Sequence, residues 1–156
     1  MQTRVAGPAE MHTFAQDFIE KLDRAADSAT VVGLSGELGA GKTTFAQAAA
    51  KALGVTDTVN SPTFVIEKIY SLEGSPPAGG WQRLVHIDAY RLKNGDELKH
   101  LGWDELLADP SNLILVEWPE HVEGAIPQNA HRIRIEIGEG EHRTVSSSRA
   151  QRSDPE

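Results

Sequence analysis

A glycine-rich segment of eight residues constrains this chain more than any other feature: Gly36-Glu37-Leu38-Gly39-Ala40-Gly41-Lys42-Thr43. It matches the pattern G-x-x-x-x-G-K-[ST] of a phosphate-binding loop (P-loop) at every position. Glycines let consecutive backbone N–H groups converge on phosphate oxygens, and the lysine brings a positive charge to the outer phosphates. The hydroxyl that follows can ligate Mg²⁺, which prefers oxygen ligands. The segment therefore predicts a site for a nucleoside triphosphate.

The residues on either side fit a strand–loop–helix unit. The run Thr30–Ser35 is short, apolar and rich in β-branched residues, as a buried strand should be. The run Thr43–Gly54 is rich in alanine, which favours helix, and Gly54 is a suitable stop. The N-terminus of that helix adds a positive dipole. A glycine turn between two core elements explains the turn but not Lys42 followed by Thr43.

Length and composition exclude several classes of protein. A chain of 156 residues supports one domain with a sizeable core. The absence of cysteine excludes disulfides, thiolate zinc sites and cysteine nucleophiles. There is neither an apolar run of membrane-spanning length nor a signal pattern, so we expect a cytoplasmic protein. The formal net charge of −8 disfavours direct binding of nucleic acid, which requires a basic face.

Hydrophobic patterns predict the other elements. Met11–Leu22 has helical spacing, and we expect this helix to begin at Gly7-Pro8. Two β-rich runs, Thr63–Tyr70 and Arg83–Tyr90, suggest a hairpin, because the Gly- and Pro-rich segment Glu73–Gly80 leaves no room for a crossover helix. The remaining predictions are one or two short helices in Glu97–Leu107 interrupted near Gly102, a buried strand at Asn112–Glu117, a half-exposed strand at His131–Ile137 and a short strand at Arg143–Val145.

The C-terminal end of the chain differs in composition from the rest. From Ser146 onward it is polar, with almost nothing apolar, and we expect it to be disordered. The prediction is a single domain at residues 1–145 and a disordered tail at residues 146–156.

Two acidic positions are candidates for the chemistry of a P-loop. Glu117 ends an apolar run, where P-loop proteins have a second metal-binding carboxylate. The alternative is an acid that only marks the solvent end of a strand. Period-two alternation puts His86, Asp88 and Tyr90 on one face of a strand. A carboxylate there can orient an attacking water or bind metal through water, and Arg91 can offset phosphate charge. The alternative is a solvated hairpin face with a cross-strand pair.

Two further segments could lie near a nucleotide. Ser61-Pro62-Thr63-Phe64 carries hydroxyls that can reach a γ-phosphate or its metal and order the segment as a switch; the alternative is a turn that begins a strand. Trp118 directly follows Glu117, and we expect this lone aromatic side chain to pack against the core; the alternative is a position near the nucleotide.

Together these segments resemble the TsaE (YjeE) family, the P-loop ATPase of bacterial tRNA threonylcarbamoyladenosine biosynthesis. The pieces that carry the resemblance are the P-loop with Thr44, Ser61-Pro62-Thr63-Phe64, His86-Ile87-Asp88-Ala89-Tyr90-Arg91-Leu92, Leu101-Gly102 and Val116-Glu117-Trp118-Pro119. They stand in the order of the family, and the resemblance covers roughly residues 8–145. One departure is Glu37, where the family more often has Asp.

The resemblance implies a three-layer α/β fold of the P-loop NTPase type, with a central mixed sheet, a β-hairpin and flanking helices. It further implies a Mg²⁺-dependent ATPase, weak alone, which supports turnover by TsaD and TsaB and meets tRNA only through that complex. By position, Lys42 and Asp88 become the catalytic residues, and Thr43 and Glu117 the Mg²⁺ ligands. The residues implied to hold ATP are Thr13 (beside the adenine), Glu37, Leu38, Gly39, Ala40, Gly41, Lys42, Thr43, Thr44 and Thr63.

The main alternative is a small-molecule kinase with the same loop. Such kinases close an arginine-bearing lid over the phosphates. Arg83 and Arg91 are the only arginines between Arg24 and Arg132, and no lid-like insertion carries an arginine cluster. A nucleotide-binding module without catalysis is disfavoured by the complete set of predicted catalytic and metal-binding residues.

Overall fold

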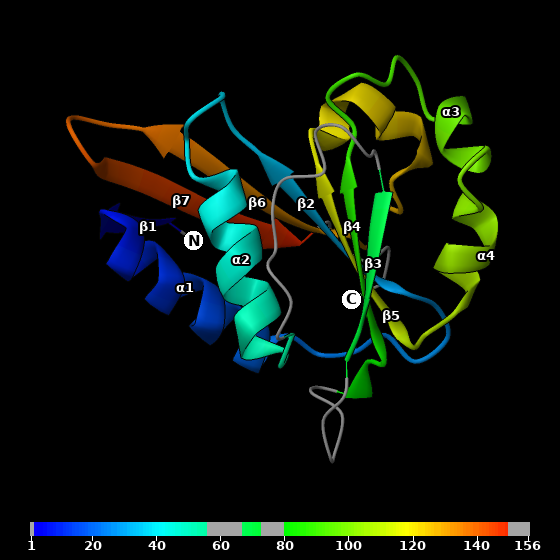
Figure 1. Cartoon of the computed structure of the whole chain (residues 1–156). Helices are drawn as coiled ribbons and strands as arrows, with labels where there is room; N and C mark the ends of the chain where they lie inside the picture. The colour runs from blue at the N-terminus through cyan, green and yellow to red at the C-terminus, as the bar shows by residue number, and fades with distance from the viewer. Residues whose placement is uncertain (1, 56–66, 73–79, 150–156) are drawn as a thin grey trace, which may run out of the picture.

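The protein is built around one mixed β-sheet. A computed structural model describes residues 2–55, 67–72 and 80–149. Within them, seven strands form the sheet in the order β1-β7-β6-β2-β5-β4-β3 (Figure 1). The strands are β1 (Gln2–Ala6), β2 (Thr30–Ser35), β3 (Glu67–Ser71), β4 (Arg83–Asp88), β5 (Asn112–Glu117), β6 (His131–Ile137) and β7 (His142–Arg149). The helices are α1 (Pro8–Lys21), α2 (Lys42–Ala52), α3 (Asp96–Lys99), α4 (Trp103–Ala108) and the 3₁₀ segment η2 (Pro119–Ala125).

The centre of the sheet is parallel and its edges are antiparallel. Strands β6, β2, β5 and β4 run in one direction, whereas β3 pairs antiparallel with β4, and β7 pairs antiparallel with both β6 and β1. Parallel strands have their carboxyl ends at the same edge of the sheet, where α/β proteins bind ligands. In the register, Glu117 at the end of β5 is opposite both Leu34 of β2 and Asp88 of β4.

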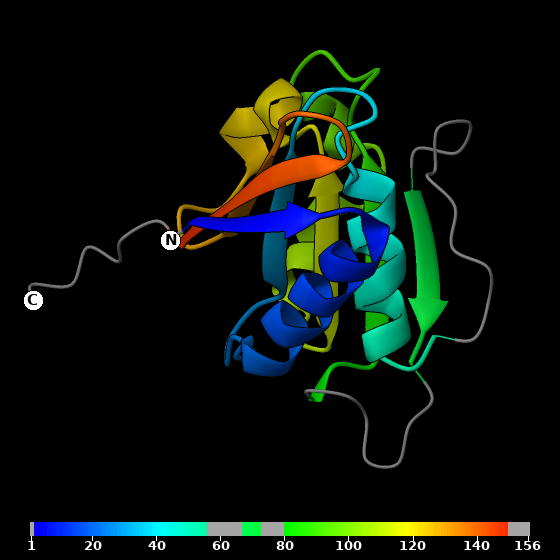
Figure 2. The ribbon, with the colours of Figure 1, turned by 90° about the vertical axis from the view of Figure 1, so that its left-hand side faces the viewer.

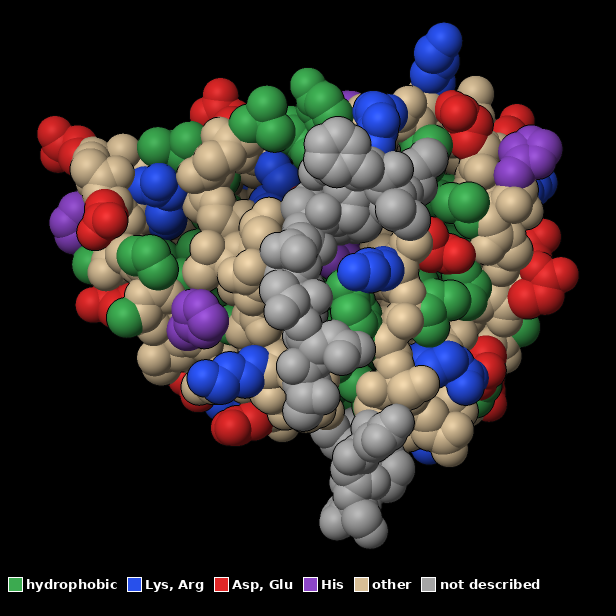
Figure 3. Space-filling model, in the orientation of Figure 1, with side chains coloured by type: hydrophobic (Ala, Val, Ile, Leu, Met, Phe, Trp, Pro, Cys, Tyr) green, Lys and Arg blue, Asp and Glu red, His purple; other side chains and the backbone are tan. Residues whose placement is uncertain are grey.

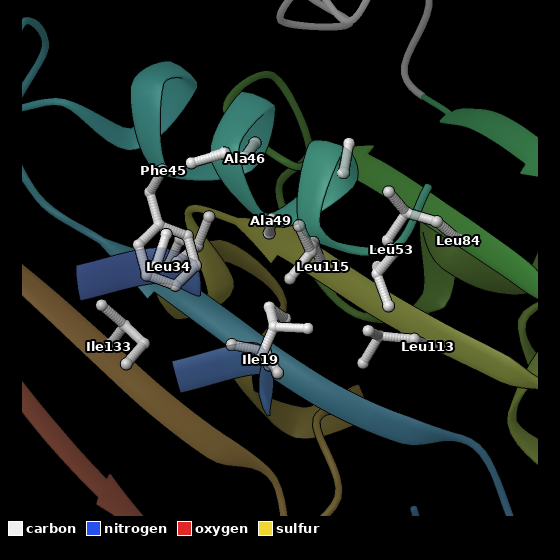
Figure 4. Close-up of a cluster of buried hydrophobic side chains, with 14 of the residues drawn as sticks. Ile19, Leu34, Phe45, Ala46, Ala49, Leu53, Leu84, Leu113, Leu115 and Ile133 are labelled. Atoms are coloured by element: carbon white, nitrogen blue, oxygen red, sulfur yellow. The ribbon is translucent and has the colours of Figure 1, made fainter. Parts of the chain in front are cut away.

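Helices cover both faces of the sheet, which confirms the predicted three-layer α/β fold. Helices α1 and α2 cover one face, and α3, α4 and η2 lie on the other (Figures 1 and 2). On the first face, Phe45 of α2 packs among Leu34, Leu115 and Ile133 of the sheet (Figure 4). The alanines of α2 let the helix lie close to the strands, since the side chain of Ala49 is fully buried there.

Most predicted elements are confirmed. The first helix begins at Pro8, directly after Gly7, as predicted, and the fixed φ of Pro8 suits a helix start. Strands β3 and β4 form the predicted antiparallel hairpin pair. The helical region breaks at Gly102, which has φ +76°. Strand β1 was not predicted. It has only five residues, and a hydrophobic pattern this short does not distinguish a strand from a coil.

The predicted domain boundary at residue 145 is wrong. Strand β7 continues to Arg149: Ser146 is opposite both Gln2 of β1 and Arg134 of β6, and residues 147–149 are opposite β6. Pairing of the backbone holds this polar stretch in the sheet without an apolar side-chain pattern. The part of the predicted tail at residues 150–156 lies outside the described residues.

No helix in the described ranges is long and apolar enough to cross a membrane. The cytoplasmic location remains a prediction from sequence.

The close fit of α2 can be tested with a larger side chain. We expect Ala49→Leu to lower the free energy of unfolding by about 1–3 kcal/mol, because the added atoms must displace packed strands. Ala108→Leu is the matched control, since Ala108 is exposed at the end of α4. Urea unfolding of both variants measures the difference, and equal stability of the two would contradict the packing described here.

Candidate active site

The P-loop joins β2 to α2 at the carboxyl edge of the parallel strands (Figure 1). Gly41 has φ +116° directly before the first helical residue, a conformation that L side chains rarely adopt. Gly36 runs against strand β6: a Cβ on it would lie 2.6 Å from the carbonyl oxygen of Ile135. Within the loop, the Ala40 amide donates to the Glu37 carbonyl at 3.0 Å. These glycines are therefore required by the path of the backbone as well as by the phosphate-binding pattern.

The Lys42 side chain folds back over the loop that precedes it. Its Nζ donates to the carbonyl of Gly36 and, at 3.2 Å, to that of Glu37. The same Nζ lies 4.2 Å from the centre of the Trp118 ring, within the range of a cation–π interaction. Burial lowers the pKa of Lys42 below its ordinary value, and the nearby carboxylates of Glu117, Glu120 and Asp88 oppose that shift. The ammonium group thus sits at the loop with acceptors that a phosphate oxygen can replace.

A hollow of about 520 Å³ opens beside the loop and gathers most of the predicted site. Its lining residues are Leu38, Gly39, Gly41, Lys42, Thr43, Thr44, Asp88, Tyr90, Glu117 and Trp118. They come from the P-loop, the start of α2, and the ends of β4 and β5. The structure therefore brings together residues separated by up to 80 positions, from Leu38 to Trp118, as the predicted site requires.

The two predicted acids are buried neighbours at the ends of adjacent strands. Asp88 is 8% exposed and Glu117 is 3% exposed. The Tyr90 amide donates to Asp88 Oδ1 at 3.0 Å, and Glu117 Oε2 lies 2.6 Å from Nε2 of His86. The alternative of a solvated hairpin face is wrong, because the side chains of His86 and Asp88 on this face are both buried. Tyr90 lies beyond the strand and is 44% exposed.

Trp118 packs against the buried core, as predicted, and it also borders the hollow. It is only partly buried, and its ring lies at the rim of the hollow over Lys42, next to Tyr90 at 5.1 Å and His121 at 5.3 Å between ring centres. Its backbone has φ +60°, so the chain turns sharply after Glu117 and directs the ring toward the loop. The position of an aromatic residue immediately after the strand-end acid was the available sequence signal.

The remaining predicted ATP-binding residues have different positions. Glu37 is exposed on the loop. Ala40 is buried and lines a second, smaller hollow between the loop and the start of α1, together with Met11 and Arg143. Thr13 is exposed on α1 and lines neither hollow, so the structure does not bring it to the loop. Thr63 and the rest of the predicted switch segment, residues 61–64, lie outside the described residues.

Arg143 is a residue of this region that the sequence did not reveal. From β7 its guanidinium reaches across to the P-loop, where Nε donates to the carbonyl of Ala40 at 3.1 Å and Nη2 to that of Gly39 at 3.4 Å. Nη1 donates to the carbonyl of Gly140 in the preceding turn and to that of His142, the first residue of β7. Arg143 therefore ties the middle of the loop to the β6–β7 connection, more than 100 residues away in the chain.

The surface on the side shown in Figure 3 has no continuous basic patch among its described residues. Lysine and arginine side chains are interspersed there with aspartate and glutamate. This agrees with the acidic net charge, and this face gives no support for direct nucleic-acid binding.

A strand, a glycine loop and a helix, with two acids at the ends of neighbouring parallel strands, define a P-loop-type α/β protein. Comparison with known proteins is more specific. The family model described as "Threonylcarbamoyl adenosine biosynthesis protein TsaE" matches residues 5–145, and the chain belongs to this TsaE family.

Several relatives support the assignment to the TsaE family. The chain is 44% identical to the tRNA threonylcarbamoyladenosine biosynthesis protein TsaE of Streptomyces coelicolor, over 79% of this chain and 77% of that protein. It is 37% identical to the Bacillus subtilis protein of the same name, over 94% and 84% of the two chains. The crystal structure of Bacillus subtilis YdiB is similar, with a TM-score of 0.75 and 30% identity over 97% of this chain and 86% of that one.

The role of Arg143 can be tested on the loop itself. We expect Arg143→Met to speed hydrogen–deuterium exchange in residues 36–44 by about fivefold to tenfold, the effect of losing about 1 kcal/mol of hydrogen bonding. Arg134→Met is the control, because Arg134 is exposed on neighbouring β6 and its ion pair is with Glu136 at 3.7 Å. Unchanged exchange in the Arg143 variant would show that the loop holds its shape without this contact.

Proposed function

We propose that this protein is a Mg²⁺-dependent ATPase that acts in the threonylcarbamoyladenosine modification of tRNA. The observation that carries the proposal is the convergence of Lys42, Thr43, Asp88 and Glu117 on one hollow beside the P-loop. The membership of the TsaE family supports the pathway. Lysine, hydroxyl and two carboxylates are the side chains that phosphoryl transfer from a nucleotide requires.

In this proposal the phosphates of ATP lie along the P-loop. The loop amides and the N-terminus of α2 donate to phosphate oxygens. The Lys42 ammonium exchanges the carbonyls of Gly36 and Glu37 for the outer phosphates, which are stronger acceptors because they are charged. This exchange gives the partly desolvated ammonium charged hydrogen-bond acceptors in place of neutral ones.

Thr43 and Glu117 are the residues that would hold Mg²⁺. Hydroxyl and carboxylate oxygens are the hard donors that this ion prefers, and both side chains line the hollow. No group of three or more His, Cys, Asp or Glu in the described part of the chain could hold a metal ion. That fits an ion whose shell is completed by nucleotide phosphates and waters, as is usual for Mg²⁺. When bound, the ion neutralises charge on the phosphates.

Asp88 would position the attacking water. Its carboxylate lies at the end of β4 beside Glu117 and lines the same hollow. It accepts a hydrogen bond from the Tyr90 amide, which fixes its orientation. A fixed carboxylate can accept a hydrogen bond from water and hold it in line with the γ-phosphate. With Glu117 as the metal ligand, Asp88 is the acid left for this task.

We further propose that turnover depends on TsaD and TsaB, with tRNA met only through that complex. The names of the relatives support the pathway, and the mixed charges of Figure 3 support indirect rather than direct contact with tRNA. The small-molecule kinase is the weaker alternative. Arg83, one of the two arginines available for a lid, is at the amino end of β4 and pairs with Asp109 and Asn112, at the opposite end from the hollow.

Steady-state hydrolysis of ATP tests this proposal. We expect slow Mg²⁺-dependent release of phosphate from the protein alone and at least about tenfold faster release with TsaD and TsaB, in the range by which completing a catalytic site changes rates. Lys42→Ala should greatly weaken ATP binding in calorimetry, because the phosphates lose their cation. Unchanged affinity in this variant would contradict the P-loop assignment, and rapid phosphorylation of a small alcohol without partners would favour the kinase.

Asp88→Asn separates water positioning from binding. The variant keeps the shape of the side chain and loses its charge, so we expect ATP affinity to change by less than about threefold while kcat falls by about 100-fold or more, a typical effect of losing a group that acts on the proton of the nucleophile. Calorimetry and single-turnover hydrolysis measure the two quantities. Equal losses in both would assign Asp88 to the metal or to structure instead.

A further inference from the structure

The site contains a buried polar pair that the proposed chemistry does not use directly. His86 is 1% exposed, and its Nε2 lies 2.6 Å from Oε2 of Glu117, the candidate metal-binding carboxylate. The two side chains come from the neighbouring strands β4 and β5. His86 is opposite Leu115 in the register and lies two residues before Asp88, on the same face of β4. His86 is thus held on the same face of the sheet as the two acids, deeper than either.

The surroundings of the second ring nitrogen define which nitrogen carries the proton. Nδ1 of His86 is buried and has no hydrogen-bond partner among the described residues. A proton on Nδ1 would be a buried donor without an acceptor, which costs about 1–3 kcal/mol, and Nε2 would then face Glu117 Oε2 lone pair to lone pair. The tautomer with the proton on Nε2 avoids both costs and makes His86 the donor to Glu117.

We infer that His86 is a positioning residue for the metal-binding carboxylate: its Nε2–H holds Oε2 of Glu117 and leaves Oε1 for Mg²⁺. Carboxylates that bind metals are commonly held by a second hydrogen bond, and loss of such a partner typically lowers metal affinity about 10- to 100-fold. Without His86, the carboxylate of Glu117 could rotate toward Lys42, whose charge attracts it.

This inference rests on the proposed function, because it needs Mg²⁺ at Glu117. It differs from a purely structural role for the pair in what it predicts. A structural hydrogen bond stabilises the fold whether or not metal is present. A positioning hydrogen bond changes the gain in nucleotide affinity that Mg²⁺ provides.

Two amide variants separate the ring nitrogens. In His86→Gln the side-chain amide nitrogen reaches the location of Nε2, whereas in His86→Asn it reaches only that of Nδ1. The measurement is the dissociation constant of a non-hydrolysable ATP analogue, by calorimetry, with Mg²⁺ and with EDTA. We expect His86→Asn to reduce the gain from Mg²⁺ by about 10-fold or more and His86→Gln to retain most of it, with affinity in EDTA changed less than about twofold in both.

Asn112→Leu is the matched control. Asn112 is also buried and hydrogen-bonded, to Arg83 and to the carbonyl of Leu106, but it lies at the opposite end of β5 from Glu117. The Asn112→Leu substitution should lower the unfolding temperature and leave unchanged the gain in analogue affinity that Mg²⁺ provides. Thermal unfolding identifies any variant that does not fold. If the His86→Asn variant does not fold, the His86→Gln variant still tests the inference. Loss of the Mg²⁺-dependent gain in analogue affinity in a folded His86→Gln variant would overturn it.

The remaining outcomes distinguish the inference from the proposed function. An equal gain from Mg²⁺ in the His86→Asn variant and the wild-type protein would overturn the positioning role and leave the ATPase proposal intact. Equal losses of affinity with and without Mg²⁺ would also overturn it, in favour of a structural pair. A wild-type protein whose analogue affinity does not respond to Mg²⁺ would overturn the proposed function and this inference with it.

Discussion

Parallel pairing of β2, β5 and β4 is the constraint on which the candidate site depends. It aligns the carboxyl ends of three strands, so that the P-loop after β2, Glu117 after β5 and Asp88 after β4 open on one hollow. None of these groups could reach the others through local structure, because they lie in separate strand–loop units. Buried apolar strands and helices on both faces hold the three ends in register (Figure 2).

The site concentrates charge in a partly desolvated place. Lys42 is surrounded by three carboxylates that favour its ammonium form, yet burial outweighs them and lowers its pKa. Backbone carbonyls and the Trp118 ring stabilise the cation in this structure. A nucleotide phosphate would replace these neutral partners with a full charge. The same logic applies to Glu117, whose carboxylate is held by His86 and has an oxygen left for a cation.

Much of the fold and most of the site could be predicted from local patterns. The P-loop residues are adjacent in the sequence, so the motif alone predicts a phosphate-binding loop. Asp88 and Glu117 each end a recognisable apolar run, and both line the hollow beside that loop. The features that the sequence did not reveal share a physical reason. Strand β7 extends to Arg149 because its backbone pairs with β6 throughout and with β1 as far as Ser146, a stabilisation that leaves no trace in a serine-rich sequence. Trp118 reaches the hollow as well as the core because of a left-handed backbone turn that no periodicity reports.

The sequence by itself determined the phosphate-binding motif, the family resemblance and the order of most strands and helices, because these depend on short runs of residues. Only the tertiary structure decided the contacts between distant groups. It paired His86 with Glu117, carried Arg143 from the last strand to the carbonyls of Gly39 and Ala40, and put Thr13 away from both hollows beside the loop. Such contacts arise from strand register and side-chain direction across the whole sheet, which a linear pattern does not contain.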